Sequence, residues 1–315
     1  MAPSLLHTVP TSVPGVQIQY DAVTAAEEAY LLEKIEAAGG PAGHGGSALG
    51  DVATDGTSGA TRTNKSWGWK DLNGRRSMYW GGTVLPSGSL VPAPFPSFME
   101  GAWPDVLGRI AASGLYDEYT GGKGKGKERG ANHCLVNEYL PGQGIMPHTD
   151  GPSYHPCTTT LSLGSHTVLC LRSKPSHLDP SSSTAPSEVQ KIDIFLPPRS
   201  LVVLSGELYS SWLHGIQPLK GDSATSLVGC ANWNGWWNWQ ADQAAAEAEA
   251  AGDSGETDGT AGTVSTSPSP EAARADVVNR RRMAEEGAGW EREKRISLTC
   301  RRVAGKVRKN VLGLR

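Results

Sequence analysis

The chain has 315 residues, of which 38% are hydrophobic, and its formal net charge is −3. This length supports one large β domain or two ordinary domains, and the charge argues against a basic field over the whole molecule for binding nucleic acid. No apolar run approaches the ~20 residues of a membrane-spanning helix, so we expect no membrane partner. Glycine and proline, at 39 and 21 residues, predict many turns rather than long helices.

The cysteines indicate the redox environment. There are five of them, an odd number, and none forms a C-x-x-C pair. This usage is typical of reduced thiols rather than a disulfide framework. The first residues, MAPSLLHTVPTSVPGVQ, lack the basic start and long apolar run of a secretory signal. We therefore expect a monomeric protein of the cytoplasm and nucleus.

Over residues 1–130 the sequence predicts an N-terminal region made of a helix, a flexible insertion and a hairpin. After a loose arm over 1–15, Thr24 and Glu27 have the spacing of a capping box, which predicts a helix from about Thr24 to Ala38. The glycine-rich stretch 40–64 then predicts a flexible insertion.

A hairpin is expected next. Asn73 and Gly74 form a strong turn signal within residues 64–82, so the segment NKSWGWKDLNGRRSMYWGG predicts two paired strands. A flexible glycine- and lysine-rich loop is expected over 121–130.

Residues 131–315 predict a β core. Short segments rich in β-branched and aliphatic residues are separated by Gly, Pro and Ser, which is typical of strands. They are 133–139, 158–164, 166–172, 191–196, 200–206 and 295–303. A linker is expected over 173–187, and a low-complexity insertion at about 241–273 is expected to be disordered, with a weak helix over AAAEAEAA. The pattern indicates a mainly β fold with flanking helices, either a jelly-roll (cupin-like) double-stranded β-helix or another β-sandwich.

Two side chains suited to metal binding lie two residues apart in LPGQGIMPHTDGPSY. In a strand, His148 and Asp150 would point to the same face. A third candidate ligand, His214, follows a predicted strand and turn. Two histidines and one carboxylate form the facial triad of non-haem iron oxygenases, which leaves positions open for a cosubstrate and O₂. A His-x-Asp pair is common by chance, and His214 considered alone is better explained as a buried histidine that is hydrogen-bonded to the backbone.

The last predicted strand, RISLTCR, carries two arginines on one face. Arg295 and Arg301 share that face with Ser297 and Thr299, and their Cα atoms should be ~20 Å apart. Buried arginines are costly unless they are paired. We therefore expect one to bind a distant carboxylate and the other to act nearer the metal, unless the strand is a solvated basic edge.

The order of four segments resembles the AlkB-type 2-oxoglutarate- and Fe(II)-dependent dioxygenases, and among them the sixth AlkB homologue subfamily. The segments are NEYLPGQGIMPHTD, TTTLSLGSHTVLCL, LVVLSGELYSSWLHGI and RISLTCRRV. The resemblance covers about 131–216 and 294–303, and it extends more weakly to the N-terminal helix and the WGG hairpin. The chain departs from the family in the long gap between His214 and Arg295.

The resemblance implies the cofactors and the reaction. Fe(II) would be held by His148, Asp150 and His214, with 2-oxoglutarate and O₂ as cosubstrates. Oxidation of 2-oxoglutarate to succinate would accompany hydroxylation of a C–H bond. On an N-methyl group the product would collapse to formaldehyde, which amounts to demethylation.

The resemblance also implies which residues bind the cosubstrate. Asn137 and Tyr139 match an Asn-x-Tyr pair that contacts 2-oxoglutarate. Arg295 matches the arginine that pairs with its remote carboxylate, a partner that suits the guanidinium fork. Arg301 matches a second arginine near the iron. Without the resemblance, Asn137 and Tyr139 would be read as ordinary strand polarity.

The substrate side is less determined. The resemblance implies that the hairpin region around RRSMYWGG covers the substrate, with Tyr79 and Trp80 as candidate base-stacking residues. The alternative for Trp80 is packing of the hairpin onto the core. The ANWNGWWNW cluster, with tryptophans at 233, 236, 237 and 239, has no assigned role. The reaction predicted first is demethylation or hydroxylation of methylated DNA or RNA. The alternatives are a protein side-chain hydroxylase or demethylase and a non-catalytic reader of methylated nucleic acid.

Overall fold

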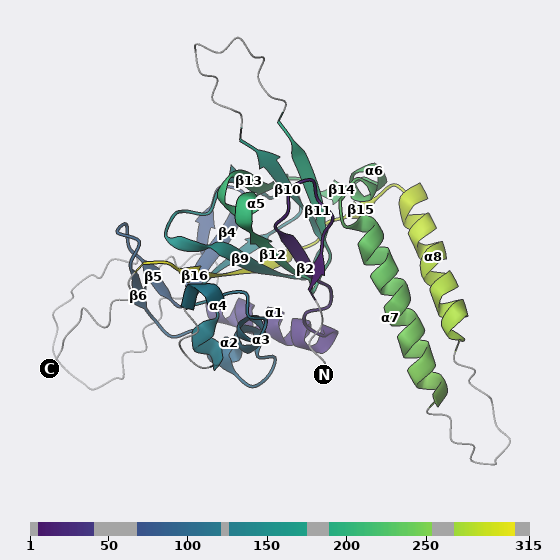
Figure 1. Ribbon diagram of the computed structural model, residues 1–315, viewed down its shortest axis with the longest axis horizontal. Helices are drawn as coiled ribbons and strands as arrows, with labels where there is room; N and C mark the ends of the chain where they lie inside the picture. The colour runs from purple at the N-terminus through teal and green to yellow at the C-terminus, as the bar shows by residue number, and fades with distance from the viewer. Residues whose placement is uncertain (1–5, 41–67, 121–125, 175–188, 254–267, 306–315) are drawn as a thin grey trace, which may run out of the picture.

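The computed structural model describes residues 6–40, 68–120, 126–174, 189–253 and 268–305 (Figure 1). The predicted flexible insertion over 40–64 lies almost wholly outside these ranges, as does most of the linker over 173–187. No helix in the described ranges is both long and apolar enough to cross a membrane.

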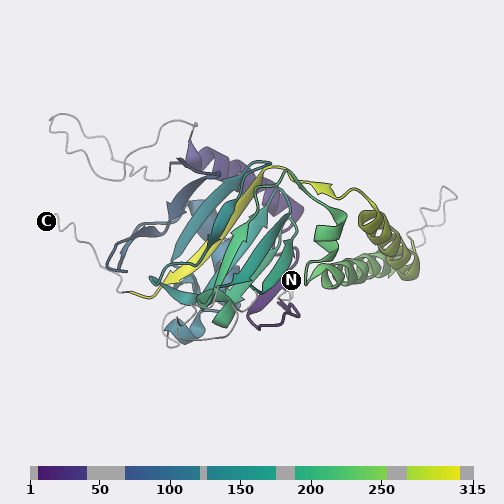
Figure 2. The same ribbon diagram turned by 90° about the horizontal axis from the view of Figure 1, so that it is seen from above.

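Two antiparallel sheets form the centre of the described molecule (Figure 2). The larger has the strand order β1-β2-β12-β9-β16-β7-β4-β3. Its strands are β1 His7–Thr8, β2 Val16–Gln19, β3 Lys70–Leu72, β4 Arg75–Trp80, β7 His133–Tyr139, β9 Tyr154–Leu163, β12 Leu201–Ser205 and β16 Arg295–Val303. The smaller sheet has the order β11-β10-β13-β8, with β8 Ile145–His148, β10 Thr167–Ser173, β11 Lys191–Leu196 and β13 Trp212–Ile216. A cavity is lined from both sheets, and the predicted double-stranded β-helix is confirmed.

Strand β16 shows how the sequence separates the two faces of the larger sheet. Ile296, Leu298 and Cys300 are fully buried in a hydrophobic cluster on the outer face. Arg295, Ser297 and Thr299 alternate with them and line the cavity between the sheets. The alternation follows from the two-residue period of a strand, so the division of this strand into a polar and an apolar face is confirmed.

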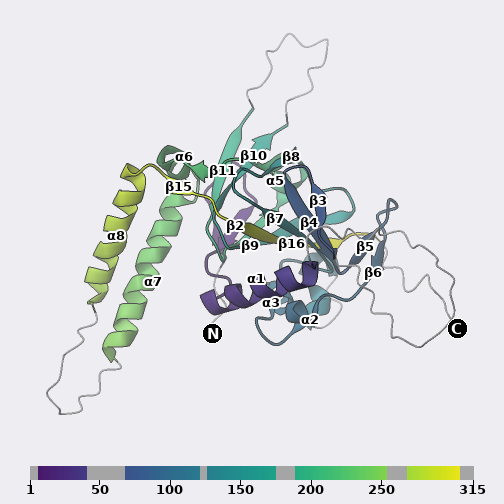
Figure 3. The ribbon, with the colours of Figure 1, turned by 180° about the vertical axis from the view of Figure 1, so that it is seen from behind.

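Helices cover the outer face of the larger sheet (Figure 3). Helix α1, Ala25–Gly39, begins at the predicted capping box, in which Thr24 and Glu27 bond reciprocally. Leu31 and Ile35, one turn apart, are fully buried against the sheet. Two shorter helices complete this layer, α2 Ser97–Glu100 and α3 Val106–Ala112, followed by α4 Asp117–Thr120 and the 3₁₀ turn η1 Gly126–Arg129.

The β3–β4 hairpin forms the far edge of the larger sheet. Its strands meet at the predicted Asn73–Gly74 turn, where Gly74 has a positive φ of 81°. Strand β4 pairs with β7, so the hairpin extends the sheet beyond the strands that the smaller sheet covers. A second hairpin follows, with β5 Gly82–Val84 and β6 Leu90–Pro92.

The segment after His214 forms a helical hairpin rather than the predicted disordered insertion. After α5 Gly206–Ser210 and β13, it contains α6 Ala224–Val228, α7 Trp233–Asp253 and α8 Pro270–Glu286. Strands β14 Gly221–Asp222 and β15 Trp290–Glu291 pair at its base. Helices α7 and α8 run side by side away from the sheets (Figure 1).

The expectation of disorder over 241–273 is therefore wrong for 241–253 and 270–273, which are helical; the weak helix predicted over AAAEAEAA is part of α7. The small side chains of Ala245 and Ala248 are buried, as is Val277 of α8. Alanine has the highest helix propensity, and a partner helix gives its methyl groups a surface to cover. Composition alone does not reveal that partner.

The tryptophan cluster anchors this helical hairpin. Trp233 and Trp236 pack against Phe195 on the outer face of the smaller sheet and against Trp290, with ring centroids 5.0–5.7 Å apart. The indole nitrogen of Trp233 donates to Glu285 of α8 over 3.0 Å. The cluster is thus part of the core, which answers the question that the sequence left open.

Candidate active site

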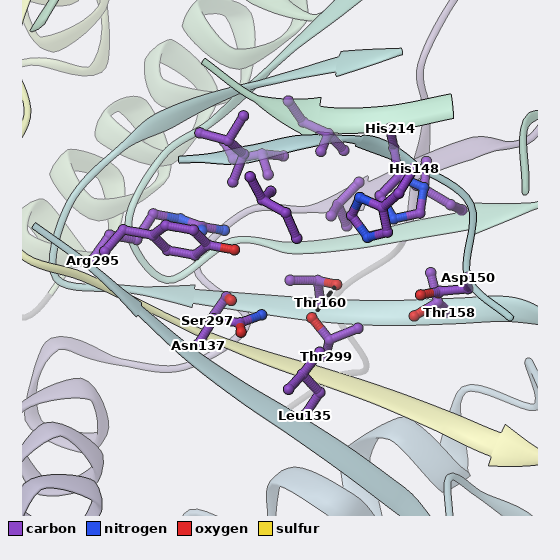
Figure 4. A pocket seen from close by; sticks show the side chains of 17 residues that line it. Leu135, Asn137, His148, Asp150, Thr158, Thr160, His214, Arg295, Ser297 and Thr299 are labelled. Carbon is purple, nitrogen blue, oxygen red and sulfur yellow. Dashed lines mark hydrogen bonds between the residues drawn. The ribbon is translucent and has the colours of Figure 1, made fainter. Parts of the chain in front are cut away.

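Three candidate metal ligands come together at the edge of the cavity. His148 ends β8, Asp150 follows it by two residues, and His214 lies directly opposite His148 on β13. One donor atom from each of the three lies within 4.8 Å of the others. Figure 4 shows the two imidazoles together above the cavity, with Asp150 below them. The predicted triad is brought together by strand pairing across 64–66 residues of chain.

The chemistry of the three donors fits a divalent cation. Within the described ranges, Asp150 Oδ2 and His214 Nδ1 are buried and lack a hydrogen-bond partner. Such atoms are costly unless a ligand satisfies them. His148 Nδ1 donates to the Met146 carbonyl over 2.8 Å, which leaves Nε2 free. Burial lowers the pKa of His214, and the neutral imidazole is the form that binds metal.

One end of the cavity is built to receive an anion. The cavity measures about 70 Å³, and Tyr139 is among its lining residues. Asn137 and Arg295 line it too (Figure 4). Arg295 is buried, and Nη2 donates to Ser162 Oγ over 2.8 Å. Its Nε and Nη1 have no partner within the described part of the chain. Burial lowers the pKa of Arg295 to about 10, so it still carries a charge at neutral pH and requires a counter-ion.

The second arginine, Arg301, contacts one of the candidate metal ligands. Arg301 Nη1 donates to Asp150 Oδ1 over 2.8 Å, and its guanidinium lies 4.0 Å from the centre of the Tyr154 ring. Arg301 therefore holds one oxygen of the candidate metal ligand and leaves the other oxygen free. The predicted division of labour between the arginines agrees with this arrangement, and the alternative of a solvated basic edge is wrong for both, since both are buried.

The two candidate substrate residues, Tyr79 and Trp80, lie on opposite faces of β4. Trp80 is fully buried and packs edge-on against Phe98 at 5.5 Å in the outer-face core. The prediction that Trp80 stacks on a base is wrong, and its alternative as a packing residue is confirmed. Tyr79, the preceding residue, points to the opposite face and is 44% exposed. Successive strand residues alternate in direction, so only one of the pair could face the site.

Tyr79 lines a second, larger cavity of about 350 Å³. His133 and Tyr154 line it too, and Tyr154 connects it to Arg301 and hence to Asp150. Neither residue is among the site candidates that the sequence predicted. His133 lies on the same face of β7 as Asn137 and could have been found by alternation. Tyr154 stands at the start of β9 after a turn-rich segment, where no local signal marks it.

Comparison with known proteins is consistent with this geometry. The family model of the 2OG-Fe(II) oxygenase superfamily matches residues 94–301. The chain is 31% identical over 211 residues to a Danio rerio protein named probable RNA/DNA demethylase ALKBH6, covering 67% of this chain and 73% of that protein. It is 28% identical over 224 residues to an Arabidopsis thaliana protein named alkylated DNA repair protein ALKBH8 homolog, covering 69% of this chain and 55% of the relative. Among solved structures, OsALKBH1 matches with a TM-score of 0.43 and 12% identity, covering 95% of this chain and all of that one.

Proposed function

Because the chain belongs to the 2OG-Fe(II) oxygenase superfamily and is AlkB-like, we propose that this dioxygenase oxidatively demethylates or hydroxylates a modified nucleic acid. One observation carries the catalytic part: His148, Asp150 and His214 converge in the same cavity as the buried guanidinium of Arg295, two of whose nitrogens lack a hydrogen-bond partner among the described residues. A binding module has no need of either feature. The reader of methylated nucleic acid is thus the weaker alternative.

When bound, iron and 2-oxoglutarate would supply an oxidant for a C–H bond, with 2-oxoglutarate and O₂ consumed and succinate and CO₂ released. The protein positions both. His148, Asp150 and His214 would hold the iron, Arg295 would bind the remote carboxylate of 2-oxoglutarate, and Arg301 orients Asp150. The two sheets enclose this chemistry and limit access of water to the cavity.

The substrate would approach through the larger cavity. Tyr79 offers an exposed ring there, and Lys70 of the hairpin edge lines the same space. An aromatic face and a cation are the two elements that bind a base and its phosphate. Burial, aided by the charge of Arg301, lowers the pKa of His133 to about 4, so this imidazole is neutral at physiological pH. The names of the curated relatives support the same class of substrate.

Succinate and formaldehyde release tests the proposal. Purified protein with Fe(II) and 2-oxoglutarate would be offered pools of methylated DNA, methylated RNA and methylated peptides, with His214→Ala as the inactive control. We expect formaldehyde from a nucleic-acid pool in proportion to succinate. Release of product from the peptide pool alone would overturn the nucleic-acid proposal and favour a protein substrate. Absence of succinate under every condition would overturn the enzymatic one.

A further inference from the structure

A residue of the edge hairpin contacts a residue that lines the cosubstrate end of the cavity. Arg75 is the first residue of β4, and Ser77, two residues later, lies opposite Asn137 of β7. Arg75 Nε donates to Asn137 Oδ1 over 3.1 Å. Asn137 is buried and lines the cavity that also contains Arg295. The hairpin that carries Tyr79 therefore touches a residue of the cosubstrate site.

The hydrogen bond determines which way the Asn137 amide points. A guanidinium can only donate, so the oxygen of the amide must face Arg75. The Nδ2 hydrogens are then directed away from Arg75 and are available to an acceptor in the cavity that Asn137 lines (Figure 4). Without this bond the two orientations of the amide would differ little in energy. One of the two would present the amide oxygen, instead of the Nδ2 hydrogens, to an anionic ligand.

The position of Arg75 is itself held. The amide of Gly144 donates to the carbonyl of Gly74 over 3.1 Å, so the hairpin turn is fixed to the chain that enters β8, the strand of His148. A Cβ on Gly74 would lie 2.9 Å from the Gly144 oxygen, which leaves no room for a side chain. Burial raises the pKa of Tyr139, while the charges of Arg295 and Arg75 act in the opposite direction. The positive charge of Arg75 thus acts on Tyr139, a residue that lines the cavity.

Arg75 is not needed to attach the hairpin. Its neighbour Arg76 points to the other face and binds Glu138 through two bonds of 2.7 Å, with a further bond to Glu36. This ion pair already joins β4 to β7. A bond from Arg75 to an amide on the cavity face would add little to it, which favours a role at the site over a role in stability.

We propose that Arg75 is a positioning residue for 2-oxoglutarate, which fixes the amide of Asn137 as a donor toward the cosubstrate and couples the β3–β4 hairpin to the cosubstrate site. The inference concerns the cosubstrate alone, so it stands or falls separately from the proposed nucleic-acid substrate.

The test is a direct titration of 2-oxoglutarate by calorimetry into Mn(II)-loaded protein, which requires no turnover. Arg75→Met removes the donor and the charge and keeps the aliphatic stem. We expect its Kd for 2-oxoglutarate to rise about five- to tenfold, the effect of losing one orienting hydrogen bond, with little change in melting temperature. Arg76→Met is the matched control: it should lower the melting temperature and leave the Kd unchanged.

A double-mutant cycle identifies the route. If Arg75 acts through Asn137, then Arg75→Met should have little further effect on Kd in an Asn137→Ala background. Additive effects of the two substitutions would overturn the positioning role, because they would mean that Arg75 acts on the ligand independently. An unchanged Kd in Arg75→Met, or an equal rise in Arg76→Met, would overturn the proposal altogether.

Discussion

The two ends of strand β16 carry the same residue type on the same face, yet they meet different surroundings. Arg295 is buried with two guanidinium nitrogens unpartnered, whereas Arg301 is buried and bonded to Asp150 with Tyr154 beneath it. One arginine has its carboxylate within the chain, and the other requires one from a ligand. The difference shows that the partner, rather than the residue, decides whether a buried arginine supports a site or binds at it.

The largest effect is expected at the Arg301 end. Asp150→Asn keeps the shape of the side chain but removes the charge that serves both the metal and Arg301. Turnover should be lost, and the free energy of unfolding should fall by about 3–5 kcal/mol because a buried cation is left unpaired. Succinate release, metal titration and a denaturant melt would measure these effects. A stable variant with normal metal affinity would show that the two ends do not differ as described.

Arg295→Ala tests the opposite end. Arg295 forms no ion pair with a carboxylate in the described part of the chain, so the loss should fall on the cosubstrate: binding of 2-oxoglutarate should weaken by about 2–5 kcal/mol. Iron affinity should change little. Calorimetric titration of each ligand separates the two. Unchanged binding of 2-oxoglutarate would remove Arg295 as the anchor and leave its unpaired guanidinium without an explanation.

Arg301→Met sharpens the comparison within the strand. Residues that orient a metal ligand typically contribute about 10- to 100-fold to metal affinity or activity, so kcat should fall by that order. The Kd for 2-oxoglutarate should stay within about threefold of the original, well below the effect at Arg295. If the cosubstrate were instead lost as in Arg295→Ala, the two arginines would share one role.

The hairpin offers a similar contrast between neighbours on opposite faces. Tyr79→Ala should raise the KM for a nucleic-acid substrate by the equivalent of about 1–3 kcal/mol, the contribution of one stacked base, and should not alter substrate-free consumption of 2-oxoglutarate. Trp80→Ala is the control, because it should lower stability as a core truncation does with no selective effect on KM. If Tyr79→Ala had the same KM as Trp80→Ala, Tyr79 would not be part of the substrate site.

The smallest effect is a dependence of stability on pH through His133. Its pKa of about 4 in the folded state lies below the ordinary value near 6.5, so the folded state binds fewer protons between these values. Its contribution to stability is therefore full above about pH 6.5 and decreases as pH falls toward 4. Between pH 7 and 5.5 the loss should be about 1 kcal/mol. A melting series of His133→Gln should show a correspondingly flatter profile, and an unchanged slope would contradict the assignment.

The sequence predicted several strands around the cavity closely, but β8 and β13, which carry His148 and His214, were not among the predicted strands. Strands β7, β11 and β16 have the predicted bounds, and the capping box at Thr24 begins α1 as expected. These elements are specified by short-range patterns, namely alternation and a side chain that reaches the backbone three residues away. The same patterns placed Asn137 with Tyr139 and Arg295 with Arg301 on shared faces.

The misjudged elements depend on distant partners. Residues 241–253 of helix α7 belong to the segment predicted as disordered from its low-complexity composition, with only a weak helix over AAAEAEAA. They are held by α8, and the helix is anchored by tryptophans that pack on Phe195. Trp80 was left between two roles because a strand pattern gives two faces without saying which one is the core. Its burial against Phe98 decided the matter.

The sequence by itself determined the residue types of the site and the local faces on which they stand, because backbone geometry repeats every two residues in a strand. The tertiary structure alone decided which of these faces meet. Pairing of β13 with β8 sets His214 beside His148, and pairing of β16 with β9 and β7 brings Arg301 to Asp150 and Arg295 to Tyr139. These contacts join residues up to 156 positions apart, and their register is selected by the burial of whole sheet faces, a property that no short stretch of the chain contains.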